Sequence, residues 1–304
     1  MSLYKLITPK GFAELLQKET TRRVVPVDST WFLPNLKRDG KQEFKDIERI
    51  PGAIFFDIDD VKDKQSVYSH MAPDLATFNK SMSELGVKRD DILVVYDRIG
   101  NFSAPRCAWT LALFGHSPIY LLNNFNVYKK EGYPLDTTQK ISFSDYPITQ
   151  YNSDVDLRSK EIISYEEMME LVKAGKLGKD YNVYDARALG RFEGRDPEPR
   201  VGMSSGHIPG VQPLPISYVL EAENSTFPEG QAATQRRLDD AYKALDVAYD
   251  ASKPTIVMCG TGVTSIIIKT ALEQSGINDI KCFDGSWTEW VLRSDPTMIA
   301  VDRN

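Results

Sequence analysis

Cys259 is the residue whose neighbours point most directly to chemistry. It follows the apolar, β-branched run 254–258, which predicts a buried strand, and it precedes the run 265–272, which predicts a helix. The five residues between Cys259 and that helix carry no charge. A loop between a strand and a helix points its backbone N–H groups toward one atom, and the helix N-terminus favours an anion there. The sequence therefore predicts a site that stabilises the thiolate of Cys259, the nucleophilic form of cysteine.

An ordinary structural role is also compatible with this stretch, because cysteine often serves as a small core hydrophobe and a short motif is weak evidence without context. The context comes from an internal repeat. In the first half Asp97 and Asn124 are 27 residues apart. Their counterparts in the second half, Cys259 and Gly285, are 26 residues apart. The repeated motifs are 25–28, 49–52, 94–97 and 120–124 in the first half, and 182–187, 206–210, 258–259 and 283–287 in the second.

The two halves each alternate short strands with helices. The β-branched run 93–96 is followed by a helical stretch at 104–114, and the second half has the same order. This alternation predicts parallel-sheet α/β units, and 304 residues suit two domains of about 150 each. A polar, aperiodic stretch marks the linker. The predicted division is an N-terminal domain at 1–145, a linker at 146–160 and a C-terminal domain at 161–304.

Several motifs carry a resemblance to a known family. They are 50–59, 190–194, 197–200, 205–210, 284–290 and the Cys-Gly-Thr-Gly-Val-Thr loop. With them the chain resembles the two-domain rhodanese superfamily over nearly its whole length. The resemblance is closest to the mercaptopyruvate and thiosulfate sulfurtransferase branch, and within it to fungal members that serve tRNA thiouridine modification. It implies an α/β fold of tandem rhodanese-like domains, each a parallel sheet flanked by helices.

The resemblance also implies which residues are catalytic. In the family the cysteine of the C-terminal domain takes a sulfur atom from a donor, holds it as a persulfide and passes it to an acceptor thiol. Cys259 matches that carrier. Asp97 stands at the equivalent place in the first domain, which is therefore expected to be catalytically inactive. The positions that match the family's proton-handling set are Thr261 in the loop and His70 and Asp59 in the first domain.

Donor binding is expected to depend on two arginines. Family members that use thiosulfate typically carry basic residues in the loop after the cysteine, whereas this loop is uncharged. Arg191 and Arg200 match the positions that bind the carboxylate and keto oxygens of 3-mercaptopyruvate, and the planar guanidinium suits a carboxylate. Within this charged run the alternative is a pair of solvated surface charges. The other expected substrate-binding residues are Gly260, Gly262, Val263 and Thr264.

Two other classes of function are known for this fold. A phosphatase of the same fold needs an arginine at the sixth position after its cysteine to grip phosphate, and that position holds Ser265. The chain could also be a non-catalytic interaction module, as some rhodanese domains are, but the retained Cys259 and its intact loop argue against this. A third alternative keeps the sulfur chemistry in cysteine catabolism, with no role in tRNA modification.

Composition limits the partners. The net charge of −6 and a pI near 5.3 argue against direct tRNA binding, which needs a basic patch. If the protein contributes to tRNA thiolation, it would therefore transfer sulfur to thiols of other proteins and not to tRNA directly. The resemblance implies a cysteine desulfurase as donor and a ubiquitin-activating-type enzyme with its own rhodanese domain as acceptor. Thioredoxin or a small thiol are the alternative acceptors.

The remaining cysteines bear on the compartment. Cys107 and Cys282 fall at expected core positions, and three cysteines give neither a disulfide framework nor zinc spacing. We therefore expect a reduced, cytoplasmic protein without a metal or cofactor. No membrane span or signal peptide is evident in the sequence, and the first twelve residues do not look like a mitochondrial presequence. The resemblance allows mitochondrial residence as well.

Overall fold

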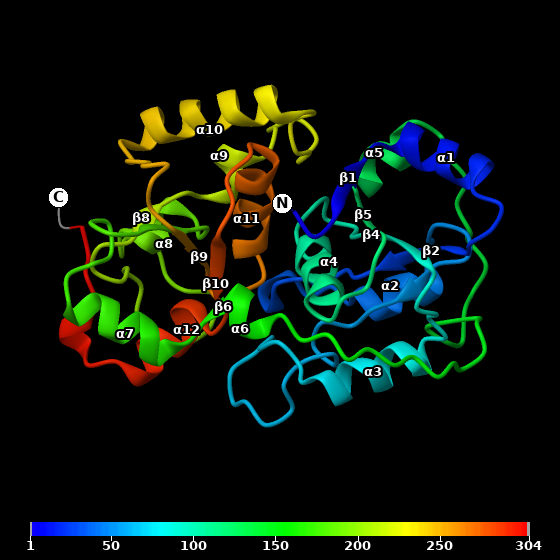
Figure 1. Ribbon diagram of the computed structural model, residues 1–304, viewed down its shortest axis with the longest axis horizontal. Helices are drawn as coiled ribbons and strands as arrows, with labels where there is room; N and C mark the ends of the chain where they lie inside the picture. Colours follow the sequence, from blue (N-terminus) through cyan, green and yellow to red (C-terminus); the bar gives the residue numbers. More distant parts are fainter. Residues whose placement is uncertain (1, 303–304) are drawn as a thin grey trace.

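Two five-stranded parallel sheets organise the computed structural model, which describes residues 2–302 (Figure 1). The first sheet has the order β1 (Lys5–Ile7), β5 (Ile119–Leu122), β4 (Ile92–Tyr96), β2 (Val24–Asp28) and β3 (Ile54–Phe55). The second has the order β6 (Ile162–Ile163), β10 (Ile280–Phe283), β9 (Thr255–Met258), β7 (Asn182–Asp185) and β8 (Gln212–Pro213). Each strand of one sheet has a counterpart in the other. The predicted repeat and the tandem α/β fold are thereby confirmed.

Helices cover both faces of each sheet. In the first domain the helices are α1 (Pro9–Lys18), α2 (Gly40–Asp46) and α5 (Phe125–Lys130) on one face, and α3 (Leu75–Glu84) and α4 (Ala104–Leu113) on the other. In the second domain they are α7 (Tyr165–Lys173), α8 (Leu189–Phe192) and α12 (Ser286–Arg293) on one face, and α9 (Ile216–Val219), α10 (Gln231–Leu245) and α11 (Ser265–Gln274) on the other. The short segments are α6 (Arg158–Glu161), η1 (Pro34–Leu36) and η2 (Pro296–Met298).

The side chains of β4 explain why the central strands are apolar throughout. Successive residues of a strand point to opposite faces of its sheet. Leu93 and Val95 pack in the cluster that contains α3 and α4, whereas Val94 and Tyr96 pack with α1, α2 and α5. Since both faces are covered, a central strand of such a sheet carries a continuous buried run in place of alternation.

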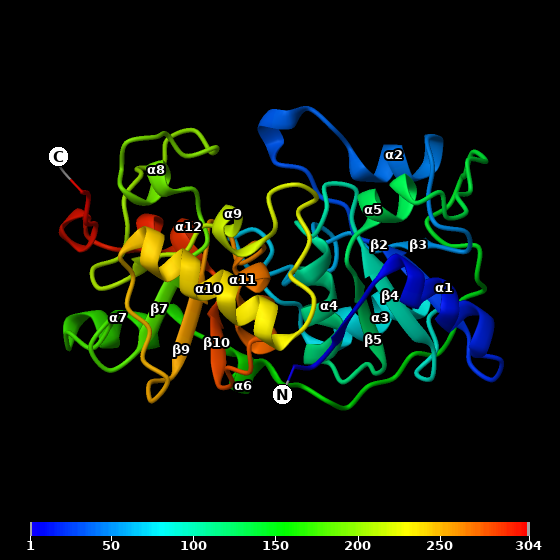
Figure 2. The ribbon, with the colours of Figure 1, turned by 90° about the horizontal axis from the view of Figure 1, so that it is seen from above.

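The two domains meet along a pair of equivalent helices. α4 follows the loop after Asp97, α11 follows the loop after Cys259, and the two helices pack against each other between the sheets (Figure 2). All ten residues of α4 are buried. One hydrophobic cluster runs through both domains, and the hydroxyl of Tyr4 lies 2.7 Å from that of Thr270 across the interface. The interface therefore holds the two equivalent loops in a fixed relation.

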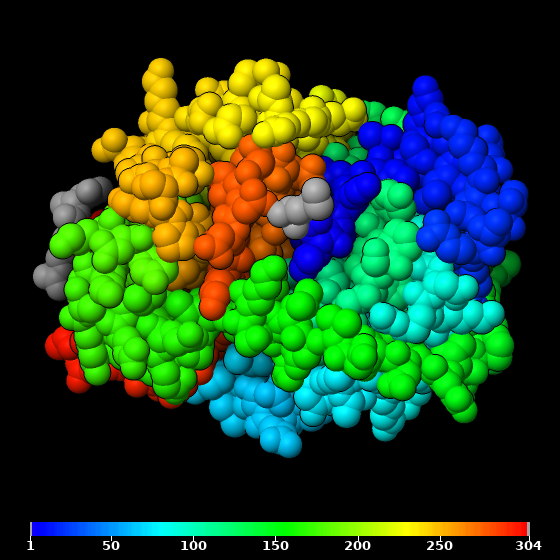
Figure 3. Space-filling view, viewed as in Figure 1, coloured from blue at the N-terminus to red at the C-terminus, as the bar shows by residue number. Residues whose placement is uncertain are grey.

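The segment 146–160, predicted as the linker, runs along the surface of the first domain. Its backbone bonds to the first domain at the carbonyls of Ser83 and Leu113, and it then reaches the second sheet through α6. Figure 3 shows this stretch as a green band that crosses from one domain to the other. The domain limits at 145 and 161 stay a prediction. Within residues 2–302, none of the helices has the length and apolarity needed to cross a membrane.

Candidate active site

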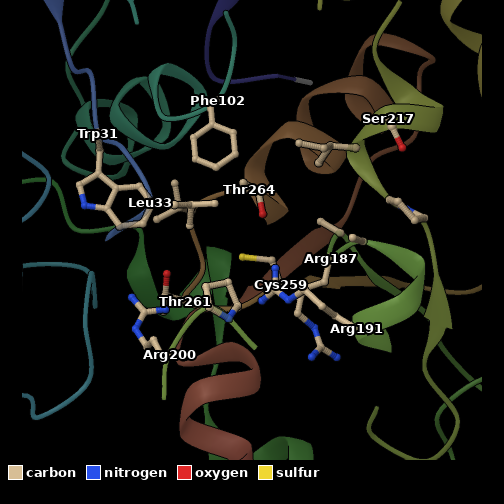
Figure 4. A pocket seen from close by; sticks show the side chains of 17 residues that line it. Trp31, Leu33, Phe102, Arg187, Arg191, Arg200, Ser217, Cys259, Thr261 and Thr264 are labelled. Carbon is tan, nitrogen blue, oxygen red and sulfur yellow. The ribbon is translucent and has the colours of Figure 1, made fainter. Parts of the chain in front are cut away.

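A cavity of about 270 Å³ lies between the domains, beside the residues that follow β7 and β9 (Figure 4). In parallel α/β sheets this is the usual place for a ligand site, because the loops at the carboxyl ends of the strands converge there. Cys259 directly follows β9, is 2% exposed and points its sulfur atom into the cavity. The first domain contributes Trp31, Leu33 and Phe102 to the wall. The site is therefore shared between the domains.

The Cys259 loop is held from behind by the start of α12. The N–H groups of Trp287 and Thr288 donate hydrogen bonds to the carbonyls of Cys259 and Gly260, both at 3.0 Å. The N–H of Cys259 donates to the hydroxyl of Ser286 at 3.1 Å. These bonds turn the carbonyls of the loop away from the cavity. Among residues 2–302, the N–H groups of 260–264 find no acceptor, so they remain free to bind an anion at the sulfur.

The equivalent loop of the first domain already contains an anion. The carboxylate of Asp97 accepts hydrogen bonds of 2.8 to 3.0 Å from five backbone N–H groups, those of Ile99, Gly100, Phe102, Ser103 and Ala104. Burial raises the pKa of Asp97, and the backbone hydrogen bonds oppose that rise. A loop of this type thus holds a negative charge at the position that Cys259 occupies in the second domain.

The three residues expected to handle protons lie in one hydrogen-bonded chain across the interface. His70 places Nδ1 3.0 Å from the hydroxyl of Thr261 and Nε2 2.9 Å from Oδ1 of Asp59. Because a carboxylate only accepts, Nε2 carries the proton and Nδ1 accepts from Thr261. Burial lowers the pKa of His70, and the hydrogen bond from His70 lowers the pKa of Asp59. A neutral imidazole therefore stands beside an ionised carboxylate.

The two arginines expected to bind the donor differ in their surroundings. Arg191 pairs with Glu198 at 2.5 Å, and the same carboxylate accepts from Arg187 at 2.8 Å. Arg200 is half-buried and has no ion pair within residues 2–302. Burial lowers the pKa of Arg200, and the charge of Cys259 opposes that shift. Arg200 is thus the cation that stands open to a ligand, whereas Arg191 is already partly neutralised.

The glycines of the Cys259 loop have different positions. Gly260 lines the cavity, as do Val263 and Thr264. Gly262 does not line it: its φ is +78°, and a Cβ there would lie 2.5 Å from the carbonyl oxygen of Asp284. Glycine is needed at this point for the turn of the loop. Gly262 therefore forms no part of the cavity wall, and its expected role in substrate binding stays a prediction.

Arg106 is a site residue that sequence reasoning missed. From α4 of the first domain its Nη1 donates to the carbonyl of Gly262 at 2.9 Å and to Oδ1 of Asp284 at 2.5 Å. Its Nη2 donates to the carbonyl of His70. One buried guanidinium thus fixes both the Cys259 loop and the histidine. One signal in the sequence could have indicated it: Arg106 is the single charged residue of a largely apolar helix. A charge buried in such a helix needs a partner, which predicts an ion pair there.

Comparison with known proteins agrees with this architecture. The chain matches the rhodanese-like domain over residues 37–129 and 164–293. It is 54% identical to the thiosulfate sulfurtransferase Tum1 of Saccharomyces cerevisiae over the full length of both chains, and the crystal structure of that protein superposes with a TM-score of 0.96. A 3-mercaptopyruvate sulfurtransferase of Mus musculus is 33% identical, with 97% of this chain and 94% of that protein covered.

A third relative is the sulfur transferase subunit of a yeast mitochondrial complex I. It is 34% identical, with a TM-score of 0.79, and the match covers 98% of this chain and all of that one. The chain has two parallel α/β repeats with a cysteine loop at their interface, and its similarity to these relatives places it in the class of sulfurtransferases. This chain belongs to the rhodanese-like family, in its two-domain form. No cluster of side chains suited to a metal ion occurs in residues 2–302.

Proposed function

We propose that this protein transfers sulfur from 3-mercaptopyruvate to an acceptor thiol through a persulfide on Cys259. The observation that carries the proposal is the sharing of one site by three features: the sulfur of Cys259, the open guanidinium of Arg200, and the Thr261 hydroxyl bonded to His70. A donor that carries a thiol and a carboxylate matches this set. Its carboxylate binds the arginine, and its sulfur lies at the nucleophile.

Charge favours 3-mercaptopyruvate over thiosulfate. The ion pairs around the cavity join Arg187 and Arg191 to Asp185 and Glu198, so two positive charges meet two negative ones. Arg200 is the cation without an ion pair in this set, and the thiolate of Cys259 adds one negative charge to the cavity. That thiolate and the nearby carboxylate of Glu198 repel a dianion such as thiosulfate more strongly than the monoanion of 3-mercaptopyruvate. The name of the yeast relative shows that thiosulfate is a donor to be tested directly.

The donor half-reaction follows from the geometry. The thiolate of Cys259 attacks the sulfur of 3-mercaptopyruvate, the carbon–sulfur bond breaks, and its electron pair remains on the carbon as the enolate of pyruvate. The proton of the substrate thiol passes by way of Thr261 and His70 to that carbon. The products are pyruvate and a persulfide anion on Cys259, so atoms and charge balance. The N–H groups of 260–264, which have no acceptor within residues 2–302, are available to stabilise the charge on the persulfide.

The second half-reaction returns the enzyme to its starting state. An acceptor thiolate attacks the outer sulfur, and Cys259 leaves as a thiolate into its amide-lined loop. Thioredoxin or a small thiol would serve as acceptor in cysteine catabolism. In tRNA wobble-uridine 2-thiolation the donor would be a cysteine desulfurase and the acceptor a ubiquitin-activating-type enzyme with a rhodanese domain. We propose the route to tRNA thiolation, in the cytoplasm and also in mitochondria. The protein itself does not contact tRNA in this proposal.

One comparison of donors tests the function. Turnover is measured on the same preparation with 3-mercaptopyruvate, thiosulfate and a persulfidated cysteine desulfurase, and Cys259→Ser serves as the blank. We expect a higher kcat/KM for 3-mercaptopyruvate than for thiosulfate. A preference for thiosulfate would contradict the argument from Arg200 and Glu198. Absence of transfer from all three donors would favour an interaction module.

A further inference from the structure

Trp31 contacts two members of the Thr261–His70–Asp59 chain at the edge of the cavity. Its indole Nε1 donates a hydrogen bond of 2.9 Å to Oδ2 of Asp59. Its ring meets the imidazole of His70 edge-on, with centroids 4.8 Å apart and an angle of 81° between the planes. Figure 4 shows the same indole in the cavity wall. Trp31 therefore faces both the substrate space and the proton-handling residues.

Asp59 needs such a neighbour because it is exposed. Its side chain is 51% exposed, whereas that of His70 is 1% exposed. An exposed carboxylate keeps rotational freedom that a second hydrogen bond restricts further. Oδ1 is bound by His70, and within residues 2–302 the hydrogen bond to Oδ2 comes from Trp31 alone. The indole thus fixes the plane of the carboxylate.

Trp31 itself is held by the catalytically silent loop of the first domain. Its backbone N–H donates to the hydroxyl of Ser103 at 3.1 Å, and its ring stacks on Phe102 at 6.3 Å with nearly parallel planes. The N–H groups of both these residues bind the carboxylate of Asp97. The loop that carries Asp97 in place of a cysteine therefore supports the residue that anchors Asp59.

We propose that Trp31 is a positioning residue, whose indole N–H holds Asp59 so that Asp59 keeps His70 oriented with Nδ1 toward Thr261. The inference rests on the proposed function of His70 as proton carrier. Trp31→Phe keeps an aromatic ring in the wall, removes the N–H donor and shortens the ring system, and the double-mutant cycle below separates the two losses. We expect kcat of the donor half-reaction to fall about tenfold, a usual size for losing a hydrogen bond to a charged group, while KM changes little.

The pKa of His70 is a second measurement, independent of enzyme activity. Three charged groups act on His70: Arg106 and Arg200 lower its pKa, as burial does, and Asp59 raises it. Lys62 acts on Asp59, which also lies beside Asp57 and Asp60 in the chain. If Trp31 holds Asp59 in place, Trp31→Phe weakens the one contact that raises the pKa of His70. The titration of His70, followed by NMR, should then move to lower pH, in the same direction as in Asp59→Ala.

A double-mutant cycle decides between positioning and simple wall packing. If Trp31 acts through Asp59, Trp31→Phe should change kcat less than about twofold in the Asp59→Ala background, because coupled residues are not additive. Ile216→Ala is the matched control: Ile216 lines the same cavity from the second domain, so its effect should multiply with that of Asp59→Ala. The indole N–H of Trp31 should also exchange faster with solvent in Asp59→Ala.

Two results would overturn the proposal: multiplicative effects of Trp31→Phe and Asp59→Ala, or an unmoved titration of His70 in Trp31→Phe. Failure of the proposed function has a different signature. In that case His70→Ala would leave the donor half-reaction at its wild-type rate, while the NMR titration would still report whether Trp31 and His70 are coupled through Asp59.

Discussion

The guanidinium of Arg106 and the carboxylate of Asp284 form a buried ion pair at 2.5 Å across the domain interface. Both side chains are at most 3% exposed. The second oxygen of Asp284 accepts the N–H of Ala72 at 2.7 Å. The pair therefore connects the Cys259 loop to the segment that carries His70, and the catalytic geometry depends on the interface.

Removal of one partner of this pair should destabilise the protein strongly. Arg106→Met leaves the charge of Asp284 buried and unpaired, which typically costs about 3–5 kcal/mol in the free energy of unfolding. Combining it with Asp284→Asn should cost less than the two single changes together, because no unpaired charge remains. Urea denaturation of the four proteins measures this. A loss below about 1 kcal/mol in Arg106→Met would show that the pair does not hold the interface.

His70→Ala should slow the donor half-reaction about 100-fold, a usual size for lost acid–base help, because the enolate then lacks its proton. Transfer from a preformed persulfide should suffer less, since that step ends on a thiolate. Stopped-flow measurement of the two half-reactions separates these effects. Wild-type rates for both in His70→Ala and Asp59→Asn would reduce the first domain to a scaffold.

The two threonines of the cavity wall offer a matched comparison. Thr261 and Thr264 both line the cavity, but the hydroxyl that meets His70 belongs to Thr261. Thr261→Val should therefore reduce the donor half-reaction about tenfold or more, while Thr264→Val should change it by less than about threefold. Equal losses in the two variants would argue that the hydroxyl of Thr261 does not transfer a proton in the reaction.

The pH dependence of the donor half-reaction should follow His70. Its neutral form accepts the proton, and burial sets its pKa below the ordinary value of 6.5. The rate should accordingly hold on acidification to pH 6.5 and fall only at lower pH, as His70 becomes protonated. Single-turnover rates across this range give the midpoint. A midpoint above 6.5 that vanishes in His70→Ala would contradict the structural environment.

Donor choice should respond to Arg200 and Glu198 in opposite ways. Arg200→Ala should reduce kcat/KM for 3-mercaptopyruvate about ten- to a hundredfold, with less effect on a persulfide donor that lacks the carboxylate. Arg191→Ala should show the same selectivity to a smaller degree. Glu198→Gln should raise the ratio of thiosulfate to 3-mercaptopyruvate use about tenfold, because the cavity gains one positive charge. Arg195→Ala is the control, since Arg195 is exposed and pairs with Glu193.

The fold was predictable because its signals are local. The run at β9 is buried at every position, as expected of a strand covered on both faces, and α11 starts at the predicted residue 265 and ends at 274, two residues beyond the predicted run. Asp97 could be matched to Cys259 from spacing alone. Two domains and their α/β class follow from such patterns without any knowledge of distant contacts.

The site was predictable only where a motif marked it. Cys259 and Thr261 lie together in sequence, and the resemblance supplied His70 and Asp59. Arg106 pairs with Asp284, and the two residues are 178 positions apart in the sequence. Trp31 follows one strand and bonds to Asp59, which follows the neighbouring strand. Nothing in composition or periodicity encodes those distances. The pairing of Arg191 with Glu198 was missed for a related reason: the motif that contains Glu198 does not say which way its carboxylate points.

The central claim is that Cys259 carries sulfur, and intact-mass analysis tests it most directly. After treatment with 3-mercaptopyruvate the wild-type protein should gain the mass of one sulfur atom, and a reducing thiol should remove it. Cys282→Ala is the control, because Cys282 is fully buried and burial raises its pKa to about 12. That variant should gain the same mass, whereas Cys259→Ser should gain none. A persulfide that survives in folded Cys259→Ser would contradict the account.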